Sequence, residues 1–132
     1  YLSYLPKEKV LIDLKPNEDD RGSFTELVKT VSAGQFSVNI TKPGITRGKH
    51  FHHSKWEFFI VIKGRALIEQ RNVSTNERYR FEVSDDKLQA VHILPGFTHK
   101  IVNLSKRNTL ITLMWANEAF DESHPDTFHE EV

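Results

Sequence analysis

The sequence contains no cysteine, which excludes disulfide bridges and thiol chemistry. It has no excess of either charge, because 18 acidic residues balance 18 basic ones, so no long-range field attracts nucleic acid or an anionic membrane. It has no apolar run near the ~18 residues of a membrane span and no visible signal peptide. It also lacks a G-x-G-x-x-G motif for a dinucleotide. We expect a cytoplasmic protein with neither nucleic-acid nor membrane partners.

The residues that are present indicate one domain built from β-strands. The chain has 132 residues, 38% of them apolar and nine of them Phe, which is enough for one core. Short apolar or alternating runs are separated by turn residues at about ten-residue intervals, a pattern typical of an all-β sandwich or barrel. Roughly ten strands are predicted, at residues 10–14, 23–29, 35–40, 48–53, 56–62, 65–72, 77–83, 88–94, 99–104 and 109–115.

The segments between these runs complete the prediction. Residues 16–22 form a polar turn, and residues 119–132 form an irregular tail on the outside. Hairpins are expected across Lys63–Gly64 and across residues 105–108.

The strand predicted at residues 56–62 is apolar on both faces. Glu57 is the only charge on a face shared with Phe59 and Val61, and such a carboxylate is costly to bury without a metal or another cation. The opposite face is wholly apolar and needs a second sheet or a second subunit to cover it. We therefore expect a homodimer.

Histidines gather around residue 50. His50 and His52 are two positions apart, so on an extended strand they point to one face. Glu57 follows them, and His99 lies in a separate motif after Pro95. Three imidazoles and one carboxylate suit a divalent metal with an open coordination position. We predict zinc, with nickel, manganese and iron as alternatives; the competing interpretation is a set of polar residues inside a sugar-binding barrel.

The spacing of these ligands resembles a known superfamily. G-x5-H-x-H-x4-E-x6-G runs from Gly44 to Gly64, and P-G-x2-H-x3-N runs from Pro95 to Asn103. Both resemble the paired signatures of the cupins, the second shortened by one residue. The resemblance implies a cupin-type double-stranded β-helix, a jelly-roll barrel, with residues 1–132 as a single domain.

A second group of polar residues lies within strand-like segments. Arginine forks suit diphosphate oxygens and sugar hydroxyls, so we predict that this group binds substrate. The alternative is ordinary surface charge. The predicted substrate-binding residues are Arg21, Glu26, Gln35, Asn39 and Arg47.

D-R-G-S-F-T-E at residues 20–26, with R-G-K-H ending at His50, resembles the dTDP-4-keto-6-deoxyglucose 3,5-epimerases. The resemblance implies that His50 is the base that removes a proton beside a ketone. That family is metal-free and usually carries Gln where this chain has His52, so the chain departs from it at a predicted metal ligand.

A closer resemblance runs over essentially the whole chain. G-I-T-R-G-K-H-F-H at 44–52, P-G-F-T-H at 95–99, W-A-N-E at 115–118 and P-D-T-F at 125–128 resemble the C-terminal cupin domain of the CapF family. Those bifunctional enzymes join an N-terminal reductase to a cupin and help make UDP-N-acetyl-L-fucosamine for bacterial capsule. The resemblance implies that the cupin epimerises C3 of a UDP-2-acetamido-2,6-dideoxy-4-hexulose. The NADPH-dependent reductase is absent from these 132 residues, so no NADPH is expected in this domain.

Epimerisation beside a ketone needs a base, an acid on the opposite face and a group that stabilises the enolate. The candidate bases are His50 and His53, and the candidate acids are Tyr79, Lys63 or water. A His50 committed to a metal cannot also be the base. Two other functions stay open: another cupin enzyme, such as a 3,4-ketoisomerase or a metal-dependent dioxygenase, and a non-catalytic metal- and sugar-binding dimerisation module.

Overall fold

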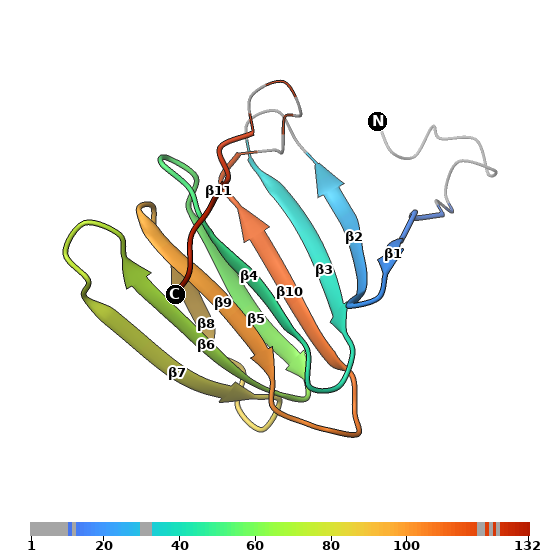
Figure 1. Ribbon diagram of the computed structural model, residues 1–132. Helices are drawn as coiled ribbons and strands as arrows, with labels where there is room; N and C mark the ends of the chain where they lie inside the picture. The colour runs from blue at the N-terminus through green and yellow to red at the C-terminus, as the bar shows by residue number, and fades with distance from the viewer. Residues whose placement is uncertain (1–10, 12, 30–32, 119–120, 122, 124) are drawn as a thin grey trace.

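The computed structural model describes residues 11, 13–29, 33–118, 121, 123 and 125–132. Within them the chain forms only β-structure, arranged in two antiparallel sheets (Figure 1). In chain order the strands are β1 (Asn17–Asp19), β2 (Gly22–Lys29), β3 (Gln35–Thr41), β4 (Thr46–Phe51), β5 (Glu57–Lys63), β6 (Arg65–Asn72), β7 (Arg78–Ser84), β8 (Ala90–Ile93), β9 (Phe97–Asn103), β10 (Leu110–Ala116) and β11 (Phe128–His129).

The two sheets exchange the chain repeatedly. The first sheet has the order β1-β2-β3-β10-β5-β8, and the second has the order β11-β4-β9-β6-β7. From β3 onward the chain crosses between sheets at nearly every connection, which is the connectivity of a jelly roll. The predicted all-β, double-layered barrel is confirmed.

The hairpins predicted across Lys63–Gly64 and across residues 105–108 are both wrong. β5 lies in the first sheet and β6 in the second, so Gly64 turns the chain from one layer to the other. The connection from β9 to β10 does the same. A glycine marks a turn because it tolerates positive φ, here 103° at Gly64, but it does not choose the strand that pairs across that turn. The β6–β7 connection is a true hairpin, with a register from Arg65↔Ser84 to Arg71↔Arg78.

The secondary structure near both ends of the chain also differs from the sequence prediction. No strand is found at the described residues of the 10–14 segment, and β1 lies instead inside the predicted polar turn. Asp19 closes that turn by accepting a hydrogen bond from the Arg21 backbone N–H at 2.8 Å, which brings β1 back along β2. In the predicted irregular tail, β11 pairs with β4 through Phe128↔Phe51 and His129↔His50.

The apolar core fills the space between the sheets. Its buried members come from both layers and are Phe59, Val61, Ala66, Ile68, Val83, Val91, Ile93, Ile101, Leu110 and Met114. Phe59 and Val61 point inward as the alternation predicts, and Glu57 shares their face. The outward face of β5 is uncovered in the single chain, with Ile62 44% exposed.

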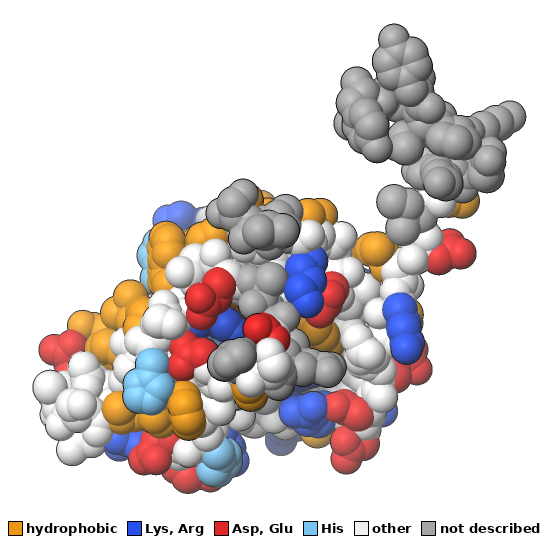
Figure 2. All heavy atoms as spheres, turned by 90° about the horizontal axis from the view of Figure 1, so that it is seen from above, with side chains coloured by type: hydrophobic (Ala, Val, Ile, Leu, Met, Phe, Trp, Pro, Cys, Tyr) orange, Lys and Arg blue, Asp and Glu red, His pale blue; other side chains and the backbone are white. Residues whose placement is uncertain are grey.

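The molecular surface carries both charges side by side, as the balanced composition predicts. Figure 2 shows acidic and basic side chains interspersed on the face seen from above. Within the described part of the chain, no helix has the length and apolar character that crossing a bilayer requires.

Candidate metal centre and cavity

The position of the first histidine depends on a bulge in β4. The register between β4 and β9 shifts between Gly48 and His50, where Gly48 has φ 104° and Lys49 has φ 64°. A Cβ on Gly48 would lie 2.6 Å from the backbone oxygen of His99, so only glycine fits this close approach. The bulge sets His50 directly opposite His99, and His52 follows on the same side of the chain.

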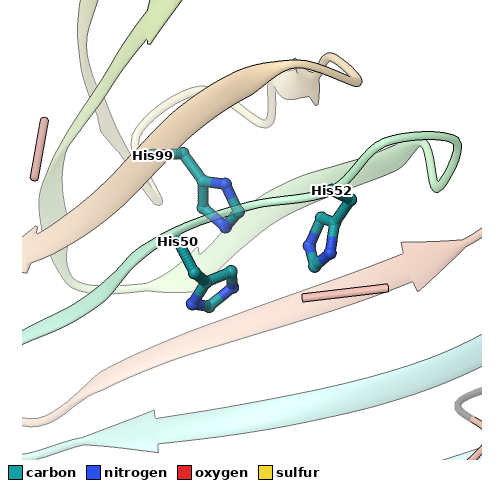
Figure 3. Close-up of side chains that lie close together, drawn as sticks. All are labelled: His50, His52 and His99. Atoms are coloured by element: carbon teal, nitrogen blue, oxygen red, sulfur yellow. The ribbon is translucent and has the colours of Figure 1, made fainter. Parts of the chain in front are cut away.

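The three histidine rings converge (Figure 3). The ring centroids lie 4.5 Å apart for His50 and His99, 5.2 Å for His50 and His52, and 5.7 Å for His52 and His99. One ring nitrogen from each lies within 4.8 Å of the others. Glu57 completes the group, with its Oε1 2.7 Å from His52 Nε2. The four side chains predicted as metal ligands are therefore together, and three histidines of this chain could hold a metal.

Hydrogen bonding around His52 tests whether this group fits a cation. His52 Nδ1 lies 2.5 Å from the backbone oxygen of Asp126, which can only accept, so Nδ1 carries a proton. Nε2 is then the ring nitrogen that faces the Glu57 carboxylate. Among the described residues, His52 Nε2, Glu57 Oε1 and His99 Nδ1 have no hydrogen-bond partner although all are buried. A shared cation satisfies these atoms, and the donor set therefore fits a divalent metal.

Burial also sets the charge of the rings. It lowers the pKa of His99 to about 3, with the neighbouring His50 acting in the same direction. Burial, followed by the charge of His52, lowers the pKa of His50. For Glu57, burial acts to raise the pKa, but the contact with His52 and the potential of His99 hold it below its ordinary value. His50 and His99 are thus neutral and Glu57 ionised near pH 7, the states in which they bind metals.

A cavity of about 360 Å³ opens beside the cluster. Its wall contains His50, Glu57 and His99. It also contains all five predicted substrate-binding residues, namely Arg21, Glu26, Gln35, Asn39 and Arg47. β2, β3 and the start of β4 carry most of this polar wall.

The two arginines differ in how they are held. Arg21 forks onto the Asp19 carboxylate at 2.6 and 3.1 Å. Arg47 is half-buried and donates to the Ser23 backbone oxygen at 3.2 Å. Burial, and then the charge of Arg21, lower the pKa of the Arg47 guanidinium, so two cations face the same space. Such a pair suits an anionic ligand.

Sequence reasoning missed other residues of the site. Lys55, in the loop between His52 and Glu57, lines the cavity and is only 8% exposed. Trp115 and Glu118 line it as well. Asp126 contacts His52 from a motif to which no role had been assigned. Alternation could not find Lys55, because it lies in a loop with no strand periodicity.

The alternative acid and base candidates lie elsewhere. His53 is exposed and packs its ring on Phe51 and Phe128, because neighbouring residues on an extended chain point to opposite sides. Lys63 is at the far end of β5 and is exposed. The Tyr79 hydroxyl, on β7, donates to Glu77 at 2.5 Å. The structure brings none of these three to the cavity of the single chain.

Solved structures of other proteins share the fold of this chain. The cupin domain of Drosophila melanogaster CENP-C aligns over 79% of this chain and 75% of its own, with 13% identity and a TM-score of 0.65, a likeness of fold alone. The capsular polysaccharide assembling protein CapF of Staphylococcus aureus is 50% identical, with a TM-score of 0.91 over 99% of this chain and 38% of its own. A UDP-2-acetamido-2,6-beta-L-arabino-hexul-4-ose reductase of Pseudomonas aeruginosa is 43% identical over 128 residues, which are 97% of this chain and 34% of that protein.

The barrel and its inward-facing histidines define a cupin with a candidate metal centre. The family described as polysaccharide biosynthesis C-terminal domain matches residues 17–128, and the chain belongs to that family. The chain spans little more than a third of the length of these two relatives.

Proposed function

We propose that this domain inverts C3 of a UDP-linked 4-keto-6-deoxy-N-acetylhexosamine on the route to UDP-N-acetyl-L-fucosamine for capsule. The observation that carries the proposal is one cavity that joins a histidine cluster to two arginines. The Pseudomonas relative is named for a UDP-linked 2-acetamido-2,6-dideoxy-4-hexulose, a ketone whose neighbouring C–H is acidic. Arg21 and Arg47 suit its diphosphate, and Gln35 and Asn39 suit its sugar hydroxyls.

His50 is the proposed base. It faces the cavity and is neutral near pH 7 because burial lowers its pKa, so a ring nitrogen can accept a proton. It removes the proton from C3, the C–H electrons form the C3–C4 double bond, and the ketone oxygen takes the negative charge. Water, the acid candidate that remains, gives a proton to the other face of C3 and restores the ketone with inverted configuration, and His50 releases its proton to solvent. The Lys55 ammonium, also on the cavity wall, is placed to stabilise the enolate oxygen.

The proposed metal is zinc, held by His52, Glu57 and His99, whose unpartnered buried atoms mark the ligand positions. When bound, a divalent ion supplies Lewis-acid polarisation of the ketone. His50 is the proposed fourth ligand, supported by the cupin spacing and by the ring nitrogens of His50, His52 and His99, which lie within 4.8 Å of one another. A ring nitrogen that binds the ion cannot accept the proton, so the two roles of His50 are separable by experiment.

The test replaces His50 with Ala and measures two quantities on the same sample. One is solvent deuterium uptake at C3 of the UDP-4-keto sugar, and the other is zinc content by elemental analysis. Loss of exchange with full zinc content supports His50 as the base. Loss of both assigns it to the metal. Exchange at the wild-type rate would remove His50 from the mechanism.

The same assay separates the other functions. Wild-type exchange no faster than buffer, with UDP-sugar binding intact, would support a non-catalytic sugar-binding dimerisation module. Movement of the keto group to C3 would support a 3,4-ketoisomerase, and oxygen consumption with added iron would support a dioxygenase.

We further propose a homodimer formed through the outer face of the first sheet. The apolar side chains Phe36, Ile40, Trp56 and Ile62 are between 37% and 44% exposed on this face, and contiguous apolar patches of that kind mark interaction sites. We propose that residues 1–132 are a single cupin domain acting beside the NADPH-dependent reductase domain of a longer chain, and that no NADPH binds here. The cytoplasmic location stays a prediction.

A further inference from the structure

The motif Pro125–Phe128 has a position that the proposed chemistry does not use. It lies in the C-terminal segment 125–132, whose strand β11 pairs with β4 next to His50. We propose that this segment is a strap that positions the metal ligand His52, with Asp126 as the positioning residue. The inference rests on the proposed metal site but not on the proposed epimerase activity.

The Asp126 carboxylate holds the loop that separates two of the ligands. Its Oδ1 accepts from the His53 backbone N–H at 2.9 Å. Its Oδ2 accepts from the backbone N–H groups of Ser54 and Lys55 at 2.8 and 3.1 Å, and from Ser54 Oγ at 3.1 Å. The loop begins directly after His52 and leads to Glu57. One carboxylate thus satisfies three successive backbone donors and fixes the path between His52 and Glu57.

The backbone of the same segment controls the ring of His52. The Asp126 carbonyl oxygen accepts the Nδ1 proton at 2.5 Å, and Thr127 Oγ1 lies 3.3 Å from the same nitrogen. These contacts select the tautomer and the ring orientation that direct the Nε2 lone pair toward Glu57 and the cluster. Partners of this kind on the outer nitrogen of a ligating histidine typically change metal affinity by about 10–100-fold.

The far end of the strap is anchored separately. Arg71 donates to Glu130 Oε1 at 3.1 Å and to the Glu131 backbone oxygen at 2.6 Å. Thr98 Oγ1 donates to the Glu130 backbone oxygen at 2.5 Å. None of these contacts involves His52 or the loop that follows it. Their loss would loosen the strap in general, whereas loss of the Asp126 side chain would act on the loop that joins His52 to Glu57.

The experiment compares Asp126→Ala and Asp126→Asn with Arg71→Gln in the full 132-residue chain. Zinc affinity is measured by chelator competition, the ligand field by the absorption spectrum of the cobalt-loaded protein, and folding by thermal unfolding of the metal-free protein. We expect both Asp126 variants to weaken zinc binding by about 10–100-fold and to alter the cobalt spectrum. Asp126→Asn is included because it keeps the side-chain volume and one acceptor, and so folds if Asp126→Ala does not.

Arg71→Gln is the matched control. It is expected to lower the unfolding temperature while leaving the zinc dissociation constant and the cobalt spectrum as in the wild type. Wild-type zinc affinity and spectrum in both Asp126 variants would overturn the strap proposal alone. A wild-type chain that binds no zinc would overturn it together with the metal site. Absence of epimerase activity would leave these readouts, and the strap, unaffected.

Discussion

Replacing Gly48 with Ala would test how strongly the β4 bulge determines the metal centre. Gly48 has φ 104°, a region that costs an L-residue about 1–2 kcal/mol. The added Cβ would also lie 2.6 Å from the His99 backbone oxygen and 3.0 Å from Lys100 Cα. Both obstacles are backbone atoms, so the β4–β9 pair has to move. We expect a total loss of about 3 kcal/mol or more in the free energy of unfolding.

Gly44→Ala is the matched control, because Gly44 also has positive φ, 71°, but a Cβ there meets nothing within 4 Å. Gly44→Ala should lower the free energy of unfolding only by the cost of a positive φ for an L-residue, about 1–2 kcal/mol. The assay is urea unfolding of the metal-free proteins, compared at constant m-value. Because the bulge sets His50 opposite His99, Gly48→Ala should also weaken zinc binding while Gly44→Ala does not. Equal losses of stability and wild-type zinc affinity in both variants would refute the role of the bulge.

Four further outcomes are expected. Zinc at 100 times its dissociation constant should raise the free energy of unfolding by about 2.7 kcal/mol, and an unchanged melting temperature would contradict the site. The decline of the deuterium-exchange kcat/KM at low pH should have its midpoint below pH 6.5, because burial lowers the pKa of His50 below that value; a midpoint at or above pH 6.5 would argue against His50. Ile62→Lys should convert a dimer to a monomer in sedimentation, whereas Phe81→Lys, on β7 of the second sheet, should not. Asn103→Ala should cost about 1–3 kcal/mol in urea unfolding with zinc affinity unchanged, because the buried amide nitrogen lies within hydrogen-bond distance of three carbonyl oxygens; an unchanged stability would contradict this.

Much of the site was predictable from local periodicity. His50 and His52 share a face because strand side chains alternate, and the same rule places Glu57 with Phe59 and Val61 toward the interior. The spacing after Pro95 brought His99 into the prediction. Arg47 and Gln35, polar residues embedded in strands and predicted to bind substrate, line one cavity.

The pairing of strands was harder to predict from the sequence. The turns at Lys63–Gly64 and at residues 105–108 were located correctly, but their flanking strands belong to different sheets. A turn residue reports local φ and ψ, whereas the choice of sheet depends on which inner faces meet across the core. β1 escaped prediction because its three residues are polar and exposed, and it is held only by pairing with β2 and by Asp19.

By itself the sequence determined the all-β class, the inward direction of the ligand side chains and the residue types around the cavity, because these follow from alternation along single strands. Only the tertiary structure decided that His50 meets His99 across a glycine bulge, that Lys55 enters the cavity, and that Asp126 reaches His52 across 74 positions of the chain. Such contacts join segments whose separation in sequence carries no periodic signal. They exist because two curved sheets pack on one core and bring distant strand ends together.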